Sequence, residues 1–539
     1  MDIIENLKLK IQSALKDLGQ EVSLNDIIIE KSKDETHGDY ASNVAMKLCR
    51  LFSKAPRDVA SMLIEKINKD GIEKIEIAGP GFINFFMKHD SLQAFVAKIL
   101  NEEDNYGRNE NKNHKINVEF VSANPTGLLH VGTARGAAIG DCISRILEFA
   151  GYDVTREYYI NDAGSQITNL ALSIQVRYQE LFGIKGEIPE DGYAGQDIID
   201  IAKLIKDEIG DEALKMNDPV AYFKEKGMKI ELDRIVKDLE TFRVKFDVFS
   251  SEKAIRSNNA IEKEIEFLKP YVYEQDDALF LKTTAFLDDK DRVIKKSNGD
   301  YTYFMPDICY HVNKMSRGFD TIIDVLGADH HGYINRMKSA LMMHGYKEDT
   351  LHVELIQMVR FLKDGQEFKA SKRRGDAITL RDVCEEVGVD AMRYFFAMRA
   401  ASTHLDFDMD LAIEQSSNNP VYYAQYAHAR LCSILEQGKD IPIDASAKLL
   451  GQPSEMALLK HLADFSNVVN DAAKDKAPYK ITNYIHSLAE LVHAFYNECR
   501  VIDQNNLELS SSRLALVKAS KIVLKNALAL IGVSAPIHM

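Results

Sequence analysis

A short segment near residue 130 combines the residue types that a nucleotide-binding turn needs. Residues 125–133 read PTGLLHVGT and place His130 and Gly132 where a strand is expected to end and a helix to begin. Backbone N–H groups and the helix dipole at such a point favour a bound anion. A glycine has no Cβ, so a phosphate or a flat ring can approach its backbone. The spacing therefore indicates a nucleotide site, although a histidine that only meets solvent at a helix start would look the same.

A second segment is strongly basic. Residues 369–375 read KASKRRG, so four cations occur within six residues and a glycine follows them. A basic loop of this kind can close over a polyphosphate and neutralise charge as it develops. Most runs of like charge are solvated surface instead, and the pattern alone leaves both interpretations open.

Other motifs exclude several kinds of active site. The sequence has no GxxxxGK[ST] loop, which excludes a Walker-type phosphate site, and it has no GxSxG motif. Residues 79–81 read GPG, and Asn84 stands where a dinucleotide fingerprint needs its third glycine, so we interpret GPG as a turn. GADHHG at 327–332 follows an expected strand, but two adjacent histidines and one aspartate are a poor metal-ligand set. We therefore expect no metal site there, and a loop at the active-site edge of a sheet instead.

The composition is that of a globular protein with several domains. The chain has 539 residues, of which 45% are hydrophobic and 28% charged, and this length exceeds what one hydrophobic core supports. The net charge of −15 argues against a protein that coats nucleic acid over its whole surface. The six cysteines are scattered, so neither structural zinc nor a disulfide framework is expected. We recognise no membrane helix and no secretory signal, and we expect a cytoplasmic protein.

Residues 1–108 are expected to form an α+β domain. Apolar residues at helical spacing predict a first helix over 1–18. The pattern then predicts a strand at 27–33, helices at 40–52 and 55–67, and a turn into a strand at 79–87. The polar residues of 101–113 are expected to form a linker.

Residues 109–410 are expected to form a Rossmann-type parallel-sheet core. A strand at 115–121 enters the turn described above, and a helix then runs from about Val131 to a C-cap at Gly151. A strand at 153–161 follows. Strand, helix and strand in this order begin a parallel α/β sheet.

The rest of the core and the C-terminal part follow from the same patterns. A long acidic segment predicts a helical insertion at about 166–250. Further strands are predicted at 301–304, 321–326 and 352–358. From Asp390 onward the pattern is almost wholly helical, so an all-α helical bundle is expected over 411–539.

Six blocks, in order along the chain, resemble the bacterial arginyl-tRNA synthetases, which belong to class I. VEFVSANPTGLLHVGTARGAAIGD at 118–141 is similar to that family's HIGH-motif segment, and KASKR at 369–373 is similar to its KMSK loop. The other similar blocks are PGFINFF at 80–86, YINDAGSQ at 159–166, GADHHG at 327–332 and VDAMR at 389–393. The last is close to the DALR sequence of an anticodon-binding domain. HIGH and KMSK alone indicate a class I synthetase, whereas the ordered set indicates arginine.

The resemblance implies an ATP-dependent ligase that attaches L-arginine to tRNA(Arg) through an arginyl-adenylate, with Mg²⁺ accompanying ATP. It also implies that residues 1–108 bind the body of the tRNA and that 411–539 bind the anticodon. We expect a monomer without membrane contacts. Two alternatives stay open: a non-catalytic tRNA-binding paralogue, and a class I synthetase for another amino acid.

By the same resemblance, individual residues receive expected roles. The HIGH-type region comprises Ala123, Asn124, Pro125, Thr126, Gly127, Leu128, Leu129, His130, Val131, Gly132 and Thr133. Residues expected to bind ATP are His130, Gly132, Thr133, Lys369, Ser371 and Lys372, and the catalytic ones among them are His130, Thr133, Lys369 and Lys372. Residues expected to bind arginine are Glu119, Ser122, Asn124, Glu252, Tyr303 and Asp307. A guanidinium ion is planar and carries five donors, so forked carboxylates such as these suit it.

The chain departs from the family pattern at two positions. Thr133 replaces the last histidine of the HIGH motif. The threonine supplies a hydroxyl donor, but the imidazole is lost. One lost transition-state hydrogen bond costs about 2.7–4 kcal/mol, so this departure leaves the catalytic rate open. Ala370 replaces the methionine of the KMSK motif, where we expect a smaller effect because that side chain would serve packing.

Overall fold

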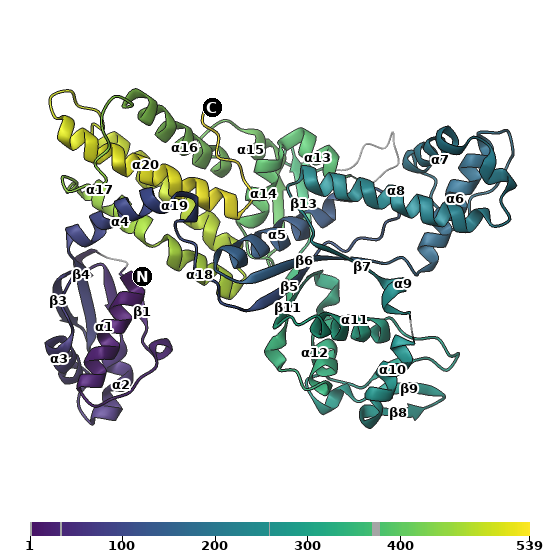
Figure 1. Ribbon diagram of the computed structural model, residues 1–539, viewed down its shortest axis with the longest axis horizontal. Coiled ribbons are helices and arrows are strands. Elements are labelled where there is room, and N and C mark those ends of the chain that lie inside the picture. Colours follow the sequence, from purple (N-terminus) through teal and green to yellow (C-terminus); the bar gives the residue numbers. More distant parts are fainter. Residues whose placement is uncertain (1–2, 33–34, 258, 369–377) are drawn as a thin grey trace.

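The structure is a computed structural model that describes residues 3–32, 35–257, 259–368 and 378–539 (Figure 1). Its first part is an α+β domain with a four-stranded antiparallel sheet in the order β1-β2-β4-β3. The helices are α1 (Ile3–Asp17), α2 (Val44–Phe52) and α3 (Pro56–Lys66). The strands are β1 (Ile29–Lys31), β2 (Tyr40–Ser42), β3 (Ile72–Ala78) and β4 (Phe82–Met87).

The expected helix at 40–52 is wrong over its first residues. Tyr40–Ser42 form β2, which pairs antiparallel with β4, and α2 begins only at Val44. Tyr40 and Ser42 are buried while Ala41 between them is half-buried, which is the period of a strand. Three residues are too few to reveal that period in a sequence. Pairing with β4, a strand much later in the chain, decides the conformation here.

The centre of the molecule is a five-stranded parallel sheet in the order β12-β11-β5-β6-β7. Its strands are β5 (Lys115–Glu119), β6 (Asp153–Ile160), β7 (Val248–Ser251), β11 (Thr321–Gly327) and β12 (Leu351–Ile356). Helix α5 (Ala134–Phe149) joins β5 to β6 and confirms the expected strand–helix–strand unit. Because all five strands run the same way, the residues that follow them meet at one edge of the sheet.

The expected strand at 301–304 is wrong. Tyr301 makes an isolated bridge with Lys295, and helix α11 (Phe304–Ser316) begins within the expected strand. The aromatic and β-branched sequence YTYF favours a strand locally. Pro306 is nevertheless tolerated in the first turn of a helix, where its missing N–H is not needed. This helix bears on function because Asp307, one of the expected site residues, lies in its first turn.

Two small sheets in this region were not predicted. One contains β8 (Val272–Gln275), β9 (Ala278–Leu281) and β10 (Arg292–Lys295), and the other contains β13 (Val359–Lys363), β14 (Gln366–Glu367) and β15 (Leu405–Asp408). Strand β15, which pairs with β13, is a four-residue exception in a chain that is otherwise helical after Asp390, as expected. The remaining helices here are α9 (Glu252–Ile255), α10 (Ala260–Phe267), α12 (Ile334–Met343), α13 (Leu380–Val387), α14 (Val389–Ala397) and α15 (Met409–Ile413).

The expected helical insertion lies between β6 and β7. It consists of α6 (Ser165–Glu180), α7 (Gln196–Ile209) and α8 (Pro219–Thr241). These helices enclose a hydrophobic core of their own, which includes Leu170, Ile174, Ile201 and Phe223. Figure 1 shows α6 and α7 at the right of the molecule, with α8 running from them back to the central sheet.

The last part of the chain is a helical bundle. It contains α16 (Pro420–Gln437), α17 (Pro453–Ala463), α18 (Phe465–Asp475), α19 (Pro478–Glu498) and α20 (Leu507–Leu530). Helix α4 (His89–Glu102) packs against α17 and α20, and Gln93 Nε2 donates to Leu450 O at 2.8 Å. The first domain is therefore joined to the bundle through α4, while the expected domain boundaries at 108 and 410 stay predictions.

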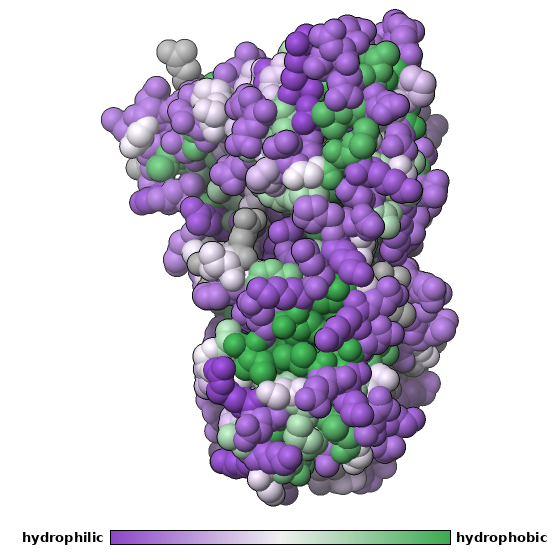
Figure 2. Space-filling model, turned by 90° about the vertical axis from the view of Figure 1, so that its left-hand side faces the viewer, coloured by the Kyte–Doolittle hydropathy of each residue, from purple (hydrophilic) through white to green (hydrophobic). Residues whose placement is uncertain are grey.

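Figure 2 shows the side of the molecule on which the first domain and the bundle both lie. Apolar side chains gather in the lower half of this face, at the level of the first domain in Figure 1, and polar side chains surround them. Among the described helices, none combines the length and the apolar character that crossing a membrane requires.

Candidate functional site

The turn that leaves β5 has an unusual backbone conformation. Val121 and Ser122 have φ angles of 68° and 40°, a region that non-glycine residues rarely occupy. Side-chain contacts hold the turn, because Ser122 Oγ donates to Glu119 Oε1 at 2.9 Å and accepts from the Tyr159 N–H at 3.0 Å. Such positions cost about 1–3 kcal/mol each and cluster at functional sites. The turn therefore marks the end of β5 as a candidate site, and it positions Ser122 between Glu119 and Tyr159.

His130 caps the short 3-10 helix that leads into α5. Its Nδ1 accepts the Gly132 N–H at 2.8 Å, which leaves Nε2 as the protonated, donating nitrogen of the exposed ring. A Cβ on residue 132 would lie 2.9 Å from that Nδ1, so a larger residue would displace the His130 ring from this cap. Thr133 Oγ1 donates to His130 O at 2.7 Å, so its hydroxyl already serves the helix start.

Close packing fixes α5 against the end of β5. A Cβ on Gly140 would lie 2.4 Å from the Phe120 ring, so the helix and the strand end could not approach this closely with any larger residue. The fully buried Arg135 donates to the carbonyls of Gln357, Ala400 and Thr403 at 2.7–2.9 Å. Burial lowers the pKa of Arg135 to about 10. These contacts hold the helix start, and His130 with it, at the carboxyl edge of the sheet.

Residues 378–380, which follow the basic segment in the chain, lie beside the turn that contains His130. Lys369, Ser371 and Lys372, like Ala370, lie outside the described residues, so their expected roles stay predictions. The chain after them returns next to His130: the Val131 N–H donates to Ile378 O at 3.0 Å and the Leu380 N–H donates to Leu129 O at 2.9 Å. Residues 378–380, which come after the basic segment in the chain, are therefore paired with residues 129–131.

Acidic side chains from three elements surround Tyr159, and we call Glu119, Glu252 and Asp307 the acidic cluster. Burial raises the pKa of Tyr159 strongly, and all three carboxylates of the cluster raise it further. The Tyr159 ring lies 4.6 Å from that of Tyr310 between ring centroids. The structure thus brings together three of the residues expected to bind arginine, and it adds Tyr159, which the sequence analysis did not name as a site residue.

The three carboxylates of the acidic cluster differ in their partners. Glu119 accepts from Lys314 Nζ at 2.5 Å, and Glu252 is paired with Arg256. No described side chain donates to the half-buried carboxylate of Asp307. Burial raises the pKa of Asp307 to about 7, and the nearby charges of Glu119 and Glu252 add to the rise. Asp307 is therefore the carboxylate of the cluster that is available to a cationic ligand.

Two expected residues stand apart from this cluster. Asn124 Nδ2 donates to Gln166 Oε1 at 2.6 Å, at the start of α6. Tyr303 lies one turn before Asp307, but it is 83% exposed. The structure therefore leaves the roles of Asn124 and Tyr303 as predictions.

A buried ionic network contacts the acidic cluster at Glu119 and at the backbone of Asp307. Lys314 is fully buried and binds both Glu119 and Asp324, the latter at 2.9 Å. His311 Nε2 lies 2.7 Å from Asp324 Oδ2 and its Nδ1 lies 2.8 Å from Asp307 O. Burial alone would raise the pKa of Asp324, but Lys314 and His311 hold it below its usual value.

This network was not predicted, although the sequence carries a signal for it. Asp307, His311 and Lys314 follow the spacing i, i+4 and i+7, so they share one face of α11. Asp324 interrupts the otherwise apolar strand TIIDVLG. Ionisable residues at buried positions are rarely unpaired, which makes such a pattern a sign of a polar network.

Replacing Lys314 by methionine will destabilise the protein. Glu119 and Asp324 would lose the cation between them, and breaking a buried pair costs about 3–5 kcal/mol. Urea unfolding followed by circular dichroism will show a lower midpoint. Lys269→Met is the matched control, because Lys269 pairs with Glu266 at the surface with side chains 72% and 73% exposed. Equal midpoints for the two variants would contradict the structural role of Lys314.

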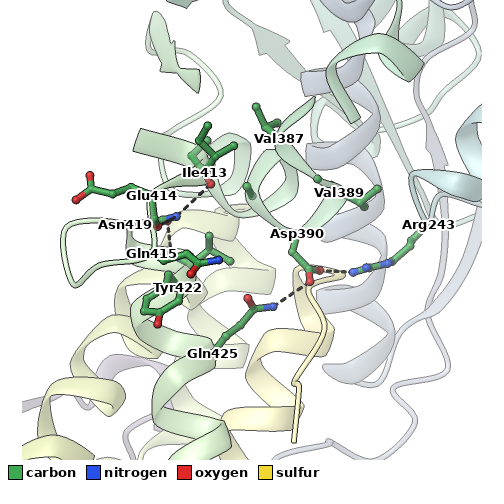
Figure 3. A pocket seen from close by; sticks show the side chains of 14 residues that line it. Arg243, Val387, Val389, Asp390, Ile413, Glu414, Gln415, Asn419, Tyr422 and Gln425 are labelled. Carbon is green, nitrogen blue, oxygen red and sulfur yellow. Dashed lines mark hydrogen bonds and ion pairs between the residues drawn. The ribbon is translucent and has the colours of Figure 1, made fainter. Parts of the chain in front are cut away.

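The block at 389–393 joins the core to the bundle. Arg393 is fully buried and donates to Asp141, to Phe242 O at 3.0 Å and to Ile531 O at 2.9 Å. Figure 3 shows Asp390 between Arg243 and Gln425, at the wall of a pocket of about 470 Å³. The block therefore has a structural role, because it ties α5, the end of α8 and the C-terminal segment together.

Comparisons with known proteins agree with the geometry. The description "Arginyl tRNA synthetase N terminal domain" matches residues 5–87, "tRNA synthetases class I (R), catalytic domain" matches 95–431 and "DALR anticodon binding domain" matches 424–539. A curated relative named Arginine--tRNA ligase from Bacillus subtilis is 50% identical over 100% of both chains.

Solved structures resemble the chain as well. A putative arginyl-tRNA synthetase from Campylobacter jejuni is 36% identical, with a TM-score of 0.78 over 84% of this chain and 100% of its own. The arginyl-tRNA synthetase of Thermus thermophilus is 22% identical and has a TM-score of 0.79 over 100% of both chains, which supports the fold.

Proposed function

The chain belongs to the arginyl-tRNA synthetase family, and on that premise we propose how it attaches L-arginine to tRNA at the expense of ATP. The arginine carboxylate attacks the α-phosphorus of ATP, the bond to the β-phosphate breaks, and pyrophosphate leaves. The 2′-hydroxyl of the terminal adenosine of the tRNA then attacks the arginyl carbonyl, and AMP leaves. Both nucleophiles belong to the substrates, so the residues of this chain bind, orient and stabilise charge.

The ATP subsite of the proposal lies at the start of α5. His130 donates from Nε2 to a phosphate oxygen, and Gly132 leaves room for the nucleotide at the backbone. Thr133 holds the helix start through its bond to His130 O. Lys369, Ser371 and Lys372 contact the triphosphate from the basic segment, whose following residues are paired with 129–131. Mg²⁺ enters with ATP, because it takes most of its ligands from phosphates and water.

The arginine subsite of the proposal is the acidic cluster. The observation that carries it is Asp307, a half-buried carboxylate that lacks a described side-chain donor and has a pKa raised to about 7. A guanidinium ion supplies both the charge and the paired donors that this carboxylate lacks. Glu252 and Tyr303 complete the recognition of the guanidinium, while Glu119, Ser122 and Asn124 face the amino-acid end of arginine.

Arginine will bind more tightly as pH rises through 7. Below its pKa of about 7 the Asp307 carboxyl holds a proton, and binding of a guanidinium requires that this proton leaves. The dissociation constant for arginine is expected to fall about tenfold between pH 6 and pH 8 and then to level off. Calorimetry in buffers of different ionisation enthalpy will detect the released proton. A dissociation constant that does not change over this range would contradict the role of Asp307.

The test of the function is a charging assay with the purified chain, ATP, total tRNA and each amino acid in turn. We expect arginine alone to be attached, and only to tRNA(Arg). Charging with another amino acid would establish a different specificity. Binding of tRNA without any charging would establish a non-catalytic paralogue.

We also propose that the protein is a monomer in the cytoplasm, which light scattering and cell fractionation will test.

A further inference from the structure

Helix α8 is linked at two places, through intervening residues, to the segment 127–133 that the proposal assigns to ATP. Near its middle, Arg234 Nη1 binds Glu231 at 3.1 Å and donates to Asp197 O at 3.4 Å, at the start of α7. Gly127 lies against the same Asp197, because a Cβ on it would be 3.7 Å from the Asp197 carboxylate. The insertion therefore contacts the segment on the N-terminal side of His130.

The second contact lies one turn further along α8. Asp238 is 6% exposed and accepts from Arg381 Nε at 3.1 Å and from Arg381 Nη2 at 2.5 Å. Arg381 stands in the first turn of α13, whose N-cap Thr379 forms a capping box with Asp382 and a β-bridge with His130. The ion pair therefore attaches residues 378–380 to α8, and their backbone bonds attach them to 129–131.

The far end of α8 is anchored to the C-terminal part of the chain. Phe242 O accepts from Arg393, and Arg243 binds both Asp390 and Gly532 O (Figure 3). Arg243 has a φ of 64°, so these contacts hold a non-glycine residue in the left-handed conformation that ends the helix. The 23 residues of α8 span about 35 Å. Helix α8 thus connects the bundle junction with the wall of the ATP site.

We propose that the ion pair between Asp238 and Arg381 is a positioning contact for the ATP site. It holds 378–380 against α8, and through them it holds His130 in the orientation that donates to a phosphate. This inference rests on the proposed function. Arg381 Nε and Nη2 both donate to Asp238 Oδ1, so the planar guanidinium fixes a direction as well as a distance, which a single ammonium group would not do.

The contact is not needed for the packing of α13. Leu380, Val383 and Val387 already bury one face of that helix. The side chain of Arg381 is 50% exposed, whereas that of Asp238 is 5% exposed, so a change at Arg381 leaves a buried carboxylate without its cation and lowers stability. Because α13 keeps its own apolar packing, the same change should also alter geometry at the ATP site without unfolding the helix.

The experiment compares Arg381→Gln, Arg381→Lys and Asp238→Asn with the wild-type chain. Charging of tRNA is measured with ATP and arginine varied separately, together with the ATP dissociation constant by calorimetry and the thermal midpoint. Misplacement far from the chemistry can lower rates by up to a hundredfold, so Arg381→Gln is expected to lower kcat/KM for ATP about ten- to hundredfold. The KM for arginine should stay close to wild type. The thermal midpoint should fall because the buried Asp238 loses its cation, and Arg381→Lys should recover part of both losses.

The matched control is Asp233→Asn on the same helix. Asp233 pairs with Lys229 at 2.8 Å, and both side chains are at least 65% exposed. This variant should behave like wild type in every measurement. Wild-type kcat/KM for ATP in Arg381→Gln would overturn the proposal, and so would equal losses in the ATP and arginine measurements. If Asp238→Asn does not fold, the kcat/KM for ATP of Arg381→Gln alone tests the proposal. Failure of the wild-type chain to charge would refute the proposed function instead, and the ATP dissociation constants would still test the contact.

Discussion

Replacing Asp307 by asparagine will raise the KM for arginine about 10²–10⁴-fold, with a much smaller change in kcat. Removing one partner from a desolvated charge pair costs about 3–5 kcal/mol, and the guanidinium lies far from the reacting carboxylate. An interaction that is equal in the ground state and the transition state affects KM rather than kcat. Steady-state charging with arginine as the varied substrate measures both constants.

The control for this variant is Glu266→Gln, which removes an acidic side chain that is 73% exposed on α10. It should leave the KM for arginine unchanged. Asp307→Asn should also abolish the pH dependence of arginine binding, because the group that titrates near pH 7 is then absent. An unchanged KM in Asp307→Asn would show that another carboxylate binds the guanidinium.

Replacing Lys372 by alanine will lower kcat about 10²–10³-fold, as the loss of a single preorganised transition-state contact does elsewhere. Negative charge moves onto the leaving pyrophosphate during adenylate formation, and a fixed cation stabilises it most in the transition state. The KM for arginine should change much less. Pre-steady-state measurement of pyrophosphate release separates this step from transfer to tRNA.

Arg374→Ala is the matched control for Lys372→Ala, because it removes one cation from the same basic run outside the KMSK-like block. A small effect in Arg374→Ala and a large effect in Lys372→Ala would locate the function in one side chain. Equal effects would mean that the segment acts only through its total charge. An unchanged kcat in Lys372→Ala would refute its catalytic role.

The sequence predicted the fold best where local pattern and tertiary structure agree. The strand–turn–helix unit around His130 was recognisable because the hydrophobic period changes from two to 3.6 across a glycine- and proline-rich turn. The errors at Tyr40–Ser42 and at Tyr301 have the opposite cause. Both are short segments. Pairing with β4, later in the chain, sets the conformation of the first, whereas helix α11 begins inside the second at Phe304.

The sequence by itself determined the order of the motifs, and this order indicated the family and the residues expected at the arginine site. It could not tell which acidic residue of that site is available to the substrate. Glu119, Glu252 and Asp307 belong to three different elements. A tertiary contact pairs Glu119 with Lys314, while a local i, i+4 contact pairs Glu252 with Arg256. Asp307 keeps no described side-chain partner at a half-buried position, so its pKa rises to about 7. The tertiary structure alone decided this, because desolvation and pairing depend on neighbours in space and not on the residue type.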